Sequence, residues 1–296
     1  MKDILLLIDA NSLIHRAFHA LPPFTAPDGT PTGALYGLSS IILKILKERR
    51  PRYVAAAFDR PEPTFREADY KEYKATRAPT ADNLIPQLIE SQNLLKILGF
   101  KTFEAPGFEA DDIVATLADR FSKEENLQIV ILSGDRDLFQ AVRGDKIVVE
   151  APQKGISNTV VYDESMVKEK FGVSPKELTD FKGLVGDKSD NIPGVLGVGP
   201  KTAAELIQKY GNLENLYREI NDVGIPNKKL EEKLVLTKET AFLSRKLAVL
   251  RRDSPAKAEL RDLELKALNK EGAKKYFENL GFQSLVERLD KNYNEY

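Results

Sequence analysis

The chain has 296 residues, of which 42% are hydrophobic and 30% are charged, proportions typical of a soluble globular protein of about two domains. It contains no cysteine, which excludes a disulfide framework and a thiolate zinc site. The apolar run before Asp9 is too short for a signal peptide, and no stretch has membrane length, so we expect a cytoplasmic protein. The net charge of −1 does not decide for or against nucleic acid, because a dense acid pocket can cancel basic patches elsewhere.

The first half of the chain alternates strand and helix patterns. Short aliphatic runs predict strands, and longer amphipathic segments predict helices between them. This alternation is typical of an α/β fold, a mostly parallel sheet flanked by helices on both faces. The strands are expected at 4–9, 53–58, 101–104, 128–132 and 146–150, and the helices at 33–48, at 82–98 and from Glu109 onward.

After about residue 160 the strand patterns disappear. Helix-sized segments at 163–171, 175–185, 200–210 and 231–243 are separated by glycine and proline, most densely in NIPGVLGVGP, and a further helix is expected within KYFENLGFQSLVERL. We therefore predict an α/β domain over 1–160 with a polar insertion at about 60–80, a helical domain over 161–260, and a helical tail or linker over 261–296.

Acidic residues follow three of the predicted strands. Asp9 and Asp59 each close an apolar run, and a third run leads into Asp135 and Asp137. A single aspartate in such a place is usually a helix cap or a turn residue. Since the carboxyl ends of parallel strands meet at one edge, where ligands of such sheets bind, we expect these acids to converge. Two further clusters extend the set, Glu109-Ala110-Asp111-Asp112 at a helix start and Asp187-Lys188-Ser189-Asp190 in a loop.

Converging carboxylates need a cation among them. Two unit charges 4 Å apart repel by roughly 4 kcal/mol at an effective dielectric constant near 20. Hard oxygen ligands select Mg²⁺ or Mn²⁺, and nine acids exceed the need of one ion. A pair of such ions can stabilise both the attacking and the leaving oxygen of a phosphoryl displacement. The candidate metal ligands are Asp9, Asp59, Glu109, Asp111, Asp112, Asp135, Asp137, Asp187 and Asp190.

The insertion TFREADYKEYKATRAPT carries cations every three residues, Lys71, Lys74 and Arg77, close to one helical face, with Tyr70 and Tyr73 between them. Aromatic rings that stack on bases and cations that meet phosphates are typical of single-strand binding. The alternative is a solvated helix balanced by its own acids. The insertion follows Asp59 directly, and this position favours a function in which Lys74 and Arg77 polarise a phosphate.

The segment GVLGVGPKTA, residues 194–203, predicts a hairpin that leads into a helix. Gly194, Gly197 and Gly199 permit the tight turn, and Pro200 suits the first helical turn. The free amides there can bind a DNA phosphate, and Lys201 opposes the helix dipole unless it also meets a phosphate. The alternative is a plain helix–turn–helix corner.

His15 and His19 have the spacing of a zinc pair. No glutamate follows the first histidine as in H-E-x-x-H, and no third ligand is evident. We therefore expect a packing role for both.

Taken together, these motifs resemble the 5′ nuclease of bacterial DNA polymerase I, a member of the flap endonuclease superfamily. The resemblance is carried by LLIDANSLIHRAFHAL, PTGALYG, FDRPEPTFRE, YKATRAPT, GFEADDIVATLA, SGDRDLFQ, GDKSDNIPGVLGVGPKTA and LENLY. It implies a PIN-like nuclease core, a C-terminal helix–hairpin–helix domain, and cleavage of 5′ flaps and duplex 5′ ends, including RNA in hybrids. It also implies two Mg²⁺ ions, with Mn²⁺ as a substitute, and roles in primer removal and nick translation.

The resemblance assigns roles to individual residues. It places Asp9, Asp59, Glu109, Asp111 and Asp135 near a first metal, Asp137, Asp187 and Asp190 near a second, and Asp112 in the same cluster. Lys74 and Arg77 match the basic pair of a helical arch, and Arg66 matches a basic position at its base. The hairpin, with Lys201 and Thr202, matches the element that grips the duplex, in some relatives with K⁺ on its carbonyls. Lys71 and Tyr73 complete the expected DNA contacts. Arg60 and Ala78 depart from the usual pattern without removing a functional group.

The expected partners are DNA with a 5′ flap, a nick or a duplex 5′ end, and an RNA–DNA hybrid, with no membrane and a monomeric state. No polymerase domain follows in this sequence, so a polymerase domain or protein is an expected partner and the chain is either a fragment or a free-standing nuclease. Two other functions stay open at this point. One is a metal-dependent RNase of the PIN type, and the other is a non-catalytic, structure-specific DNA-binding module.

Overall fold

The computed structural model describes residues 2–153, 155, 158–266 and 268–292. Its centre is a six-stranded sheet in the order β3-β2-β1-β4-β5-β6. The first five strands are parallel and β6 runs antiparallel to β5. The mostly parallel sheet expected from the sequence is thus confirmed. The strands are β1 (Asp3–Asp9), β2 (Tyr53–Ala57), β3 (Lys101–Phe103), β4 (Leu127–Leu132), β5 (Ile147–Pro152) and β6 (Thr159–Tyr162).

The central strands are buried on both faces. In β1, Leu5 and Leu7 belong to one hydrophobic core, whereas Leu6 and Ile8 belong to the core on the opposite face. This burial explains why the strands read as continuous aliphatic runs instead of alternating patterns. Because β2, β1 and β4 are neighbours in register, the chain leaves all three strands at the same edge.

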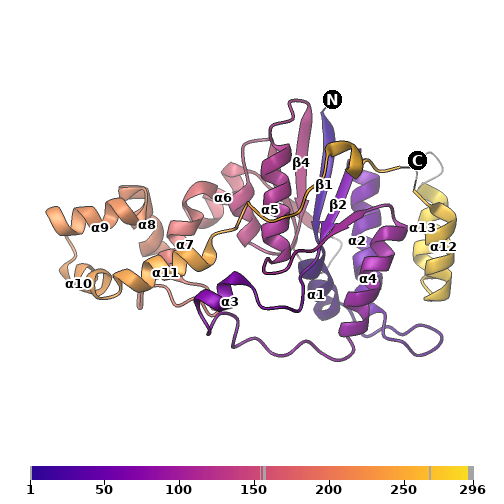
Figure 1. Cartoon of the computed structure of the whole chain (residues 1–296), viewed down its shortest axis with the longest axis horizontal. Coiled ribbons are helices and arrows are strands. Elements are labelled where there is room, and N and C mark those ends of the chain that lie inside the picture. The colour runs from indigo at the N-terminus through magenta and orange to yellow at the C-terminus, as the bar shows by residue number, and fades with distance from the viewer. Residues whose placement is uncertain (1, 154, 156–157, 267, 293–296) are drawn as a thin grey trace.

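Helices cover both faces of the sheet (Figure 1). One face carries α5 (Ala110–Phe121). The other face carries five helices of the described part of the chain, α1 (Ala10–Ala20), α2 (Gly33–Arg49), α4 (Ile85–Ile97), α12 (Lys270–Asn279) and α13 (Gln283–Asn292). The C-terminal pair, α12 and α13, packs on this face through Phe277 and Leu285.

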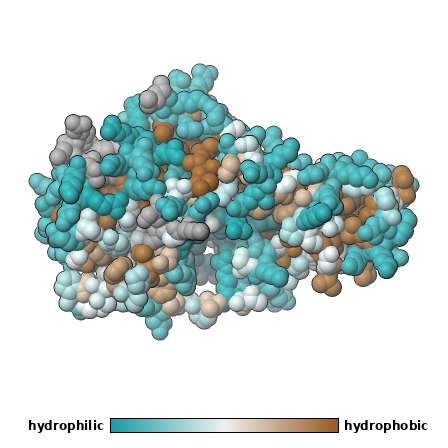
Figure 2. Space-filling view, turned by 180° about the vertical axis from the view of Figure 1, so that it is seen from behind, coloured by the Kyte–Doolittle hydropathy of each residue, from teal (hydrophilic) through white to brown (hydrophobic). Residues whose placement is uncertain are grey.

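Most of the remaining helices form a lobe that extends to one side of the sheet (Figure 1). It shares a continuous hydrophobic core with the α5 face of the sheet. Its far end exposes apolar surface (Figure 2), to which Leu196, Val223 and Leu236 contribute. The lobe consists of α6 (Glu164–Phe171), η2 (Pro175–Glu177), α7 (Leu178–Val185), α8 (Pro200–Tyr210), α9 (Leu213–Asp222), α10 (Lys228–Leu236) and α11 (Lys238–Ala248).

After α11 the chain returns across α5 towards the sheet. The backbone amide of Ser254 donates to the hydroxyl of Thr116 in α5 at 3.2 Å, and η3 (Leu260–Leu263) follows. Two short elements lie near the sheet edge, α3 (Phe65–Asp69) and η1 (Asp137–Ala141). In the described residues no helix combines the length and the apolar content that crossing a bilayer requires.

Several elements differ from the sequence-based expectations. The helix α1 was not predicted; it begins directly after β1 because Asp9 caps it, its side chain accepting from the amide of Ser12. The strand β6 and the helix α9 were also missed, and the helix predicted at 231–243 is two helices that meet at Thr237. The C-terminal segment breaks into α12 and α13 at Gly281, where φ is +73°; residues 267 and 293–296 of that predicted tail lie outside the described residues.

Candidate active site

A cavity of about 460 Å³ lies at the edge where β1, β2 and β4 end. Its walls come from the segments that follow these strands, including α1, and from the start of α5, the insertion after β2 and the loop after α7. Asp112 and Asp190 do not line it. The structure thus brings together seven of the nine predicted acids around one space, namely Asp9, Asp59, Glu109, Asp111, Asp135, Asp137 and Asp187.

Hydrogen bonds through the buried Ser133 join the ends of β1 and β4. The hydroxyl of Ser133 donates to Oδ2 of Asp9 at 2.8 Å and accepts from the backbone amide of Asp135 at 2.9 Å. The other carboxylate oxygen of Asp9 accepts from the amide of Ser12 at 3.1 Å. These bonds position Asp9 and Asp135 relative to each other before any ligand binds.

A second set of hydrogen bonds joins β2 to α5. The carboxylate of Asp59 accepts from the amide of Ala110, the first residue of α5, at 2.7 Å. The amide of Asp59 donates to the side chain of Asn11 at 3.0 Å. Asp59, two residues after the end of β2, therefore caps α5 and holds the start of that helix, with Asp111, at the cavity.

Burial and mutual repulsion disfavour the charged forms of the central acids. Burial, followed by the charges of Asp135 and Asp59, raises the pKa of Asp9 to about 7. Burial and the neighbouring Asp112 raise the pKa of Asp111 well above its usual range. Burial also raises the pKa of Asp135, although Lys182 acts in the opposite direction. A divalent cation would relieve this repulsion, so the donor set fits hard metal ions.

Cations of the chain itself contact the acids at the periphery of the cavity. The ammonium of Lys74 lies 2.5 Å from Glu109, and the guanidinium of Arg77 lies 2.6 Å from Asp190. Within the described residues, no three His, Cys, Asp or Glu side chains are already gathered in the manner of a metal cage. Mg²⁺ usually takes only one or two carboxylates, with water and substrate phosphate as its other ligands. The arrangement is therefore compatible with ions that bind together with substrate.

Lys182 of α7 contacts two acids of the predicted second metal site. Its ammonium donates to Asp137 and, at 2.9 Å, to Asp187. Burial alone would raise the pKa of Asp187, but Lys182 and hydrogen bonds from Ser189 lower it to about 2. Asp187 is thus ionised and paired with a lysine that the sequence did not single out.

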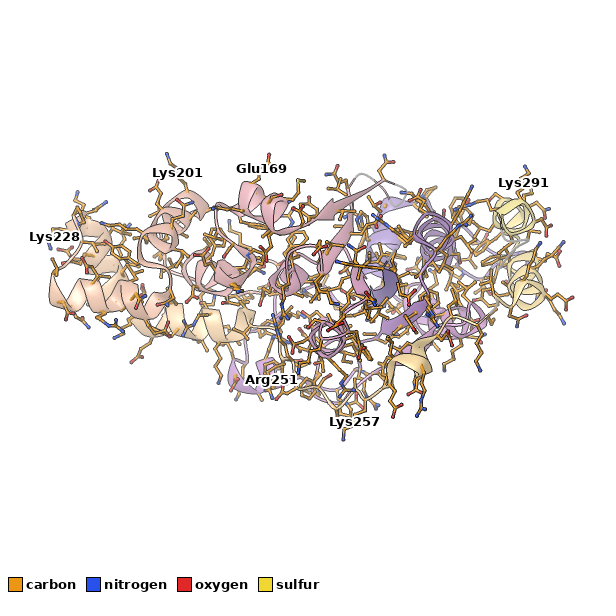
Figure 3. The ribbon with its side chains drawn as sticks, turned by 90° about the horizontal axis from the view of Figure 1, so that it is seen from above. Glu169, Lys201, Lys228, Arg251, Lys257 and Lys291 are labelled. Atoms are coloured by element: carbon orange, nitrogen blue, oxygen red, sulfur yellow. The ribbon has the colours of Figure 1, made fainter. Side chains whose placement is uncertain are left out.

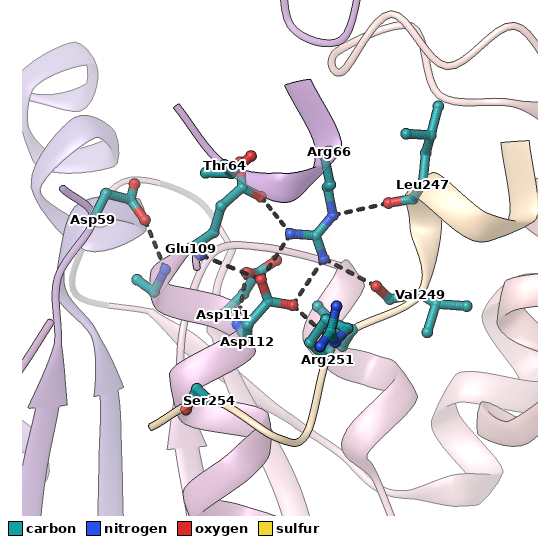
Figure 4. A network of polar contacts seen from close by, with 12 residues as sticks. Asp59, Thr64, Arg66, Glu109, Asp111, Asp112, Leu247, Val249, Arg251 and Ser254 are labelled. Carbon is teal, nitrogen blue, oxygen red and sulfur yellow. Dashed lines mark hydrogen bonds and ion pairs between the residues drawn. The ribbon is translucent and has the colours of Figure 1, made fainter. Parts of the chain in front are cut away.

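Arg66 and Asp112 form a buried network, which Figure 4 shows, and this arrangement corrects two expectations. Both side chains are almost fully buried. Each oxygen of Asp112 accepts from Arg66 at 2.8 Å and from one backbone amide, that of Glu109 or Arg251. With these four bonds the carboxylate has no free direction for a metal, and Arg66 cannot reach a substrate. Their role is structural: they hold α3 and α5 to the chain that follows α11.

The insertion is also less helical than expected. Only α3 is a helix, and residues 71–77 form successive turns, in which Lys74 has a φ of +55°. Tyr73 is buried, and its hydroxyl contacts Glu109 and Asp190 at 3.1 Å each. It is therefore not available for base stacking, which corrects that expectation. Lys71 is exposed, and Lys74 and Arg77 line the cavity.

The glycine-rich hairpin divides into a buried and an exposed part. Gly194 is buried against the backbone of Gly186, so close that a Cβ would lie 2.4 Å from the Gly186 nitrogen. Its role is packing, which corrects the expectation of a DNA contact. Gly197 and Gly199 are exposed, and Gly199 caps α8 without a side-chain hydrogen bond. In Figure 3, Lys201 points outward from the lobe; Thr202, beside it in the first turn of α8, is partly buried.

Sequence reasoning missed several residues of the site. His15 and Asn11 line the cavity, whereas the sequence predicted only packing for His15. Burial, together with His19, lowers the pKa of His15, so its imidazole is neutral at pH 7. The signal for both was present, since they lie in the helix directly after Asp9, but that helix was not predicted. No sequence pattern marked Lys182.

Comparisons with known proteins agree with this geometry. The family model described as 5′-3′ exonuclease, N-terminal resolvase-like domain, matches residues 4–172, and the one described as 5′-3′ exonuclease, C-terminal SAM fold, matches residues 173–271. DNA polymerase I of Bacillus caldotenax is 40% identical over all of this chain, which spans 33% of that polymerase. A 5′-3′ exonuclease of Aquifex aeolicus is 36% identical over 98% of this chain and 96% of its own.

Solved structures share the fold at lower identity. A T5 5′-exonuclease with bound zinc superimposes with a TM-score of 0.69 at 21% identity, covering 97% of both chains. The catalytic core of Rad2 in complex with DNA substrate superimposes with a TM-score of 0.67 at 19% identity, covering 99% of this chain and 93% of that one. From the family models and the Aquifex relative, the chain belongs to the 5′-3′ exonuclease family.

Proposed function

We propose that this protein is a structure-specific 5′ nuclease that hydrolyses phosphodiester bonds at 5′ flaps and duplex 5′ ends of DNA, and of RNA in hybrids. The observation that carries the proposal is the cavity that Asp9, Asp111 and Asp135 line together with Lys74 and Arg77. Acids that can hold divalent ions, beside cations that can meet a phosphate, form a site suited to phosphoryl transfer. The family membership and the solved relative with DNA substrate support this reading.

The acids that line the cavity would hold two Mg²⁺ or Mn²⁺ ions. Asp9, Asp111 and Asp135 are the best placed for one ion, since they have no cationic partner among the described ion pairs. Asp137 and Asp187 are the candidates for the other. When bound, such ions supply Lewis-acid stabilisation of the charge on the reacting phosphate and lower the pKa of an attacking water.

Lys74 and Arg77 position the scissile phosphate. In the absence of nucleic acid they pair with Glu109 and Asp190 across 2.5 and 2.6 Å. A phosphate that enters the cavity offers both cations an additional anionic partner, and charge-assisted hydrogen bonds of this kind are among the stronger ones in proteins. The carboxylates of Glu109 and Asp190 keep the two cations at the cavity before substrate arrives.

The exposed end of α8 would hold the duplex. Gly199 leaves the first amides of α8 without a side-chain cap, and these amides together with Lys201 and Thr202 suit a backbone phosphate irrespective of sequence. Backbone carbonyls of the hairpin would take K⁺. The single-stranded 5′ end would then pass Lys71 and the rest of the 60–80 insertion towards the cavity.

The biological setting follows from this activity. We propose primer removal and nick translation in replication and repair, carried out by a monomer at the nucleoid in the bacterial cytoplasm. The partner is DNA with a 5′ flap, a nick or a duplex 5′ end, or an RNA–DNA hybrid, and a polymerase acts on the same substrate, as a linked domain or a separate protein.

The test is cleavage of a 5′-labelled flap DNA with Mg²⁺ and with EDTA. We expect release of the flap only with the divalent ion. Single-stranded RNA of the same length serves as the comparison, because preferential cleavage of that RNA would indicate a ribonuclease instead. Tight flap binding without any Mg²⁺-dependent product would indicate a binding module and would refute the proposed activity.

A further inference from the structure

We infer that Lys182 is a built-in counter-cation of Asp137 and Asp187. Its ammonium stays bound to these two acids until a phosphate of the nucleic acid binds the ammonium in their place. The inference rests on the proposed function, because it concerns the acids proposed for the second divalent ion. It makes Lys182 a positioning residue that couples metal binding to substrate binding.

The first argument is the geometry of the contact. Asp137 begins η1 after β4, and Asp187 follows α7, so the two acids come from different parts of the fold. The single ammonium of Lys182 donates to both of them. The side chains of Lys182 and Asp137 are each only 12% exposed, and that of Asp187 is 25% exposed. The pair of acids is thus neutralised in part by a cation largely removed from water.

The second argument is the contrast between the two halves of the cavity. Asp9, Asp59, Asp111 and Asp135 form no ion pair with a lysine, arginine or histidine in the described part of the chain, whereas Asp137 and Asp187 share Lys182. Glu109, which also lines the cavity, pairs with Lys74 and Arg66 at its periphery. While the carboxylate oxygens of Asp137 and Asp187 accept hydrogen bonds from Lys182, their affinity for a divalent ion is reduced. A divalent ion that binds Asp9, Asp111 and Asp135 therefore has no lysine to displace from these three acids, whereas one that binds Asp137 and Asp187 must displace Lys182.

The third argument is that an adjoining cavity offers the ammonium of Lys182 an alternative position. A second cavity, of about 890 Å³, adjoins the first, and Arg136 and Asp187 line both. Lys182 lines this second cavity together with Lys188 and Lys201 beside the start of α8. Although Asp187 and Glu205 also line it, a cavity lined by several cations at a helix N-terminus suits a phosphate. A strand that lies there offers Lys182 an anionic partner, which frees Asp137 and Asp187 for a metal ion.

The experiment is titration of the full chain with Mn²⁺ in the absence of nucleic acid, with bound and free ion measured by electron paramagnetic resonance. In Lys182→Met we expect the Mn²⁺ affinity of the weaker site to be at least about tenfold higher than in the wild type, equivalent to about 1.4 kcal/mol. Lys176→Met removes an exposed lysine from the same lobe and is expected to match the wild type. Lys182→Arg keeps the positive charge and is also expected to have the Mn²⁺ affinity of the wild type.

Further variants separate the inference from simpler explanations. Adding Asp137→Asn to Lys182→Met is expected to abolish the gain, because one of the two released ligands is lost. If the Met variant does not fold, as judged by circular dichroism, Lys182→Gln takes its place in the titration. Equal Mn²⁺ affinity and stoichiometry in the wild type and the neutral variant would overturn the inference. Failure of the proposed function would appear differently, as a wild type that neither binds Mn²⁺ nor cleaves a flap.

Discussion

The guanidinium of Arg66 holds the carboxylate of Asp112 through two parallel hydrogen bonds of 2.8 Å each. Arg66 also donates to the carbonyl oxygens of Leu247 and Val249 at the end of α11. One buried ion pair therefore joins the insertion after β2, the start of α5 and the exit from the helical lobe. The acids that line the cavity depend on this junction for their position, although neither partner of the pair lines the cavity itself.

Breaking this pair from one side is expected to destabilise the protein strongly. Asp112→Asn removes the main counter-charge of the buried Arg66, which then keeps only Glu109, at 3.1 Å. Losses of about 3–5 kcal/mol in the free energy of unfolding are typical when one partner of a buried ion pair is removed. Urea unfolding followed by circular dichroism measures the effect. The matched control is Arg52→Ala, which breaks exposed pairs with Asp3 and Glu264 and is expected to cost less than about 1 kcal/mol. Equal costs in the two variants would contradict a structural role for Asp112.

Asp135→Asn is expected to lower the rate of flap cleavage by at least about a hundredfold, because removing a metal ligand forfeits several kcal/mol of transition-state stabilisation. Its affinity for flap DNA in EDTA should change little, since the duplex contacts are expected at the hairpin. Single-turnover cleavage and fluorescence anisotropy give the two quantities. Asp145→Asn, which alters an exposed acid paired with Lys2, is the control and should retain full activity. Undiminished cleavage by Asp135→Asn would refute the assignment.

Lys74→Met is expected to reduce turnover more than duplex affinity. The lysine lines the cavity and pairs with Glu109. Its loss removes the cation proposed to contact the reacting phosphate, an effect of about 10²–10³ in rate for comparable stabilising groups. Duplex binding is proposed to occur at the hairpin, without Lys74. Lys96→Met, an exposed lysine of α4, serves as the control. Parallel losses of affinity and turnover would argue against a positioning role for Lys74.

The metal-free protein is expected to lose stability as the pH rises from about 4 to about 7. The pKa of Asp9 is raised from 3.8 to about 7 in the folded state by burial and by Asp135 and Asp59. The folded state therefore binds a proton that the unfolded state has released in this window, and stability falls as that proton leaves. A shift of about three pKa units corresponds to at most about 4 kcal/mol. Urea unfolding in EDTA at a series of pH values measures this slope, and Asp9→Asn should flatten it.

Gly194→Ala is expected to destabilise the helical lobe. Its Cβ would lie 2.4 Å from the Gly186 nitrogen, and φ is +63° at this position, so close contact and backbone strain together predict a loss of about 2–4 kcal/mol. Gly199→Ala is the matched control. Nothing lies within 4 Å of a Cβ there, and its cost should stay below about 1 kcal/mol. Thermal unfolding of both variants distinguishes packing at Gly194 from a role in DNA binding alone.

Much of the fold and part of the site were predictable because they depend on local patterns. The buried strands around Leu6, Val54 and Val130 have continuous aliphatic runs, and strand neighbours in a parallel sheet end at one edge. That logic was sufficient to bring Asp9 and Asp135 to one cavity. The same logic does not predict α1, because Asp9 both ends the strand β1 and caps the helix that follows it directly.

By itself, the sequence determined the parallel α/β core, the helical second part and the acids at the strand ends, since hydrophobic periodicity and turn chemistry act over a few neighbouring residues. Tertiary structure alone decided which charges face each other. Asp112 and Asp111 are adjacent in the chain, yet Asp112 is saturated by Arg66 and two backbone amides, whereas Asp111 lines the cavity. Likewise, Lys182 reaches Asp137 from 45 residues away. Such partnerships depend on distance and burial in three dimensions, which no local pattern of residues contains.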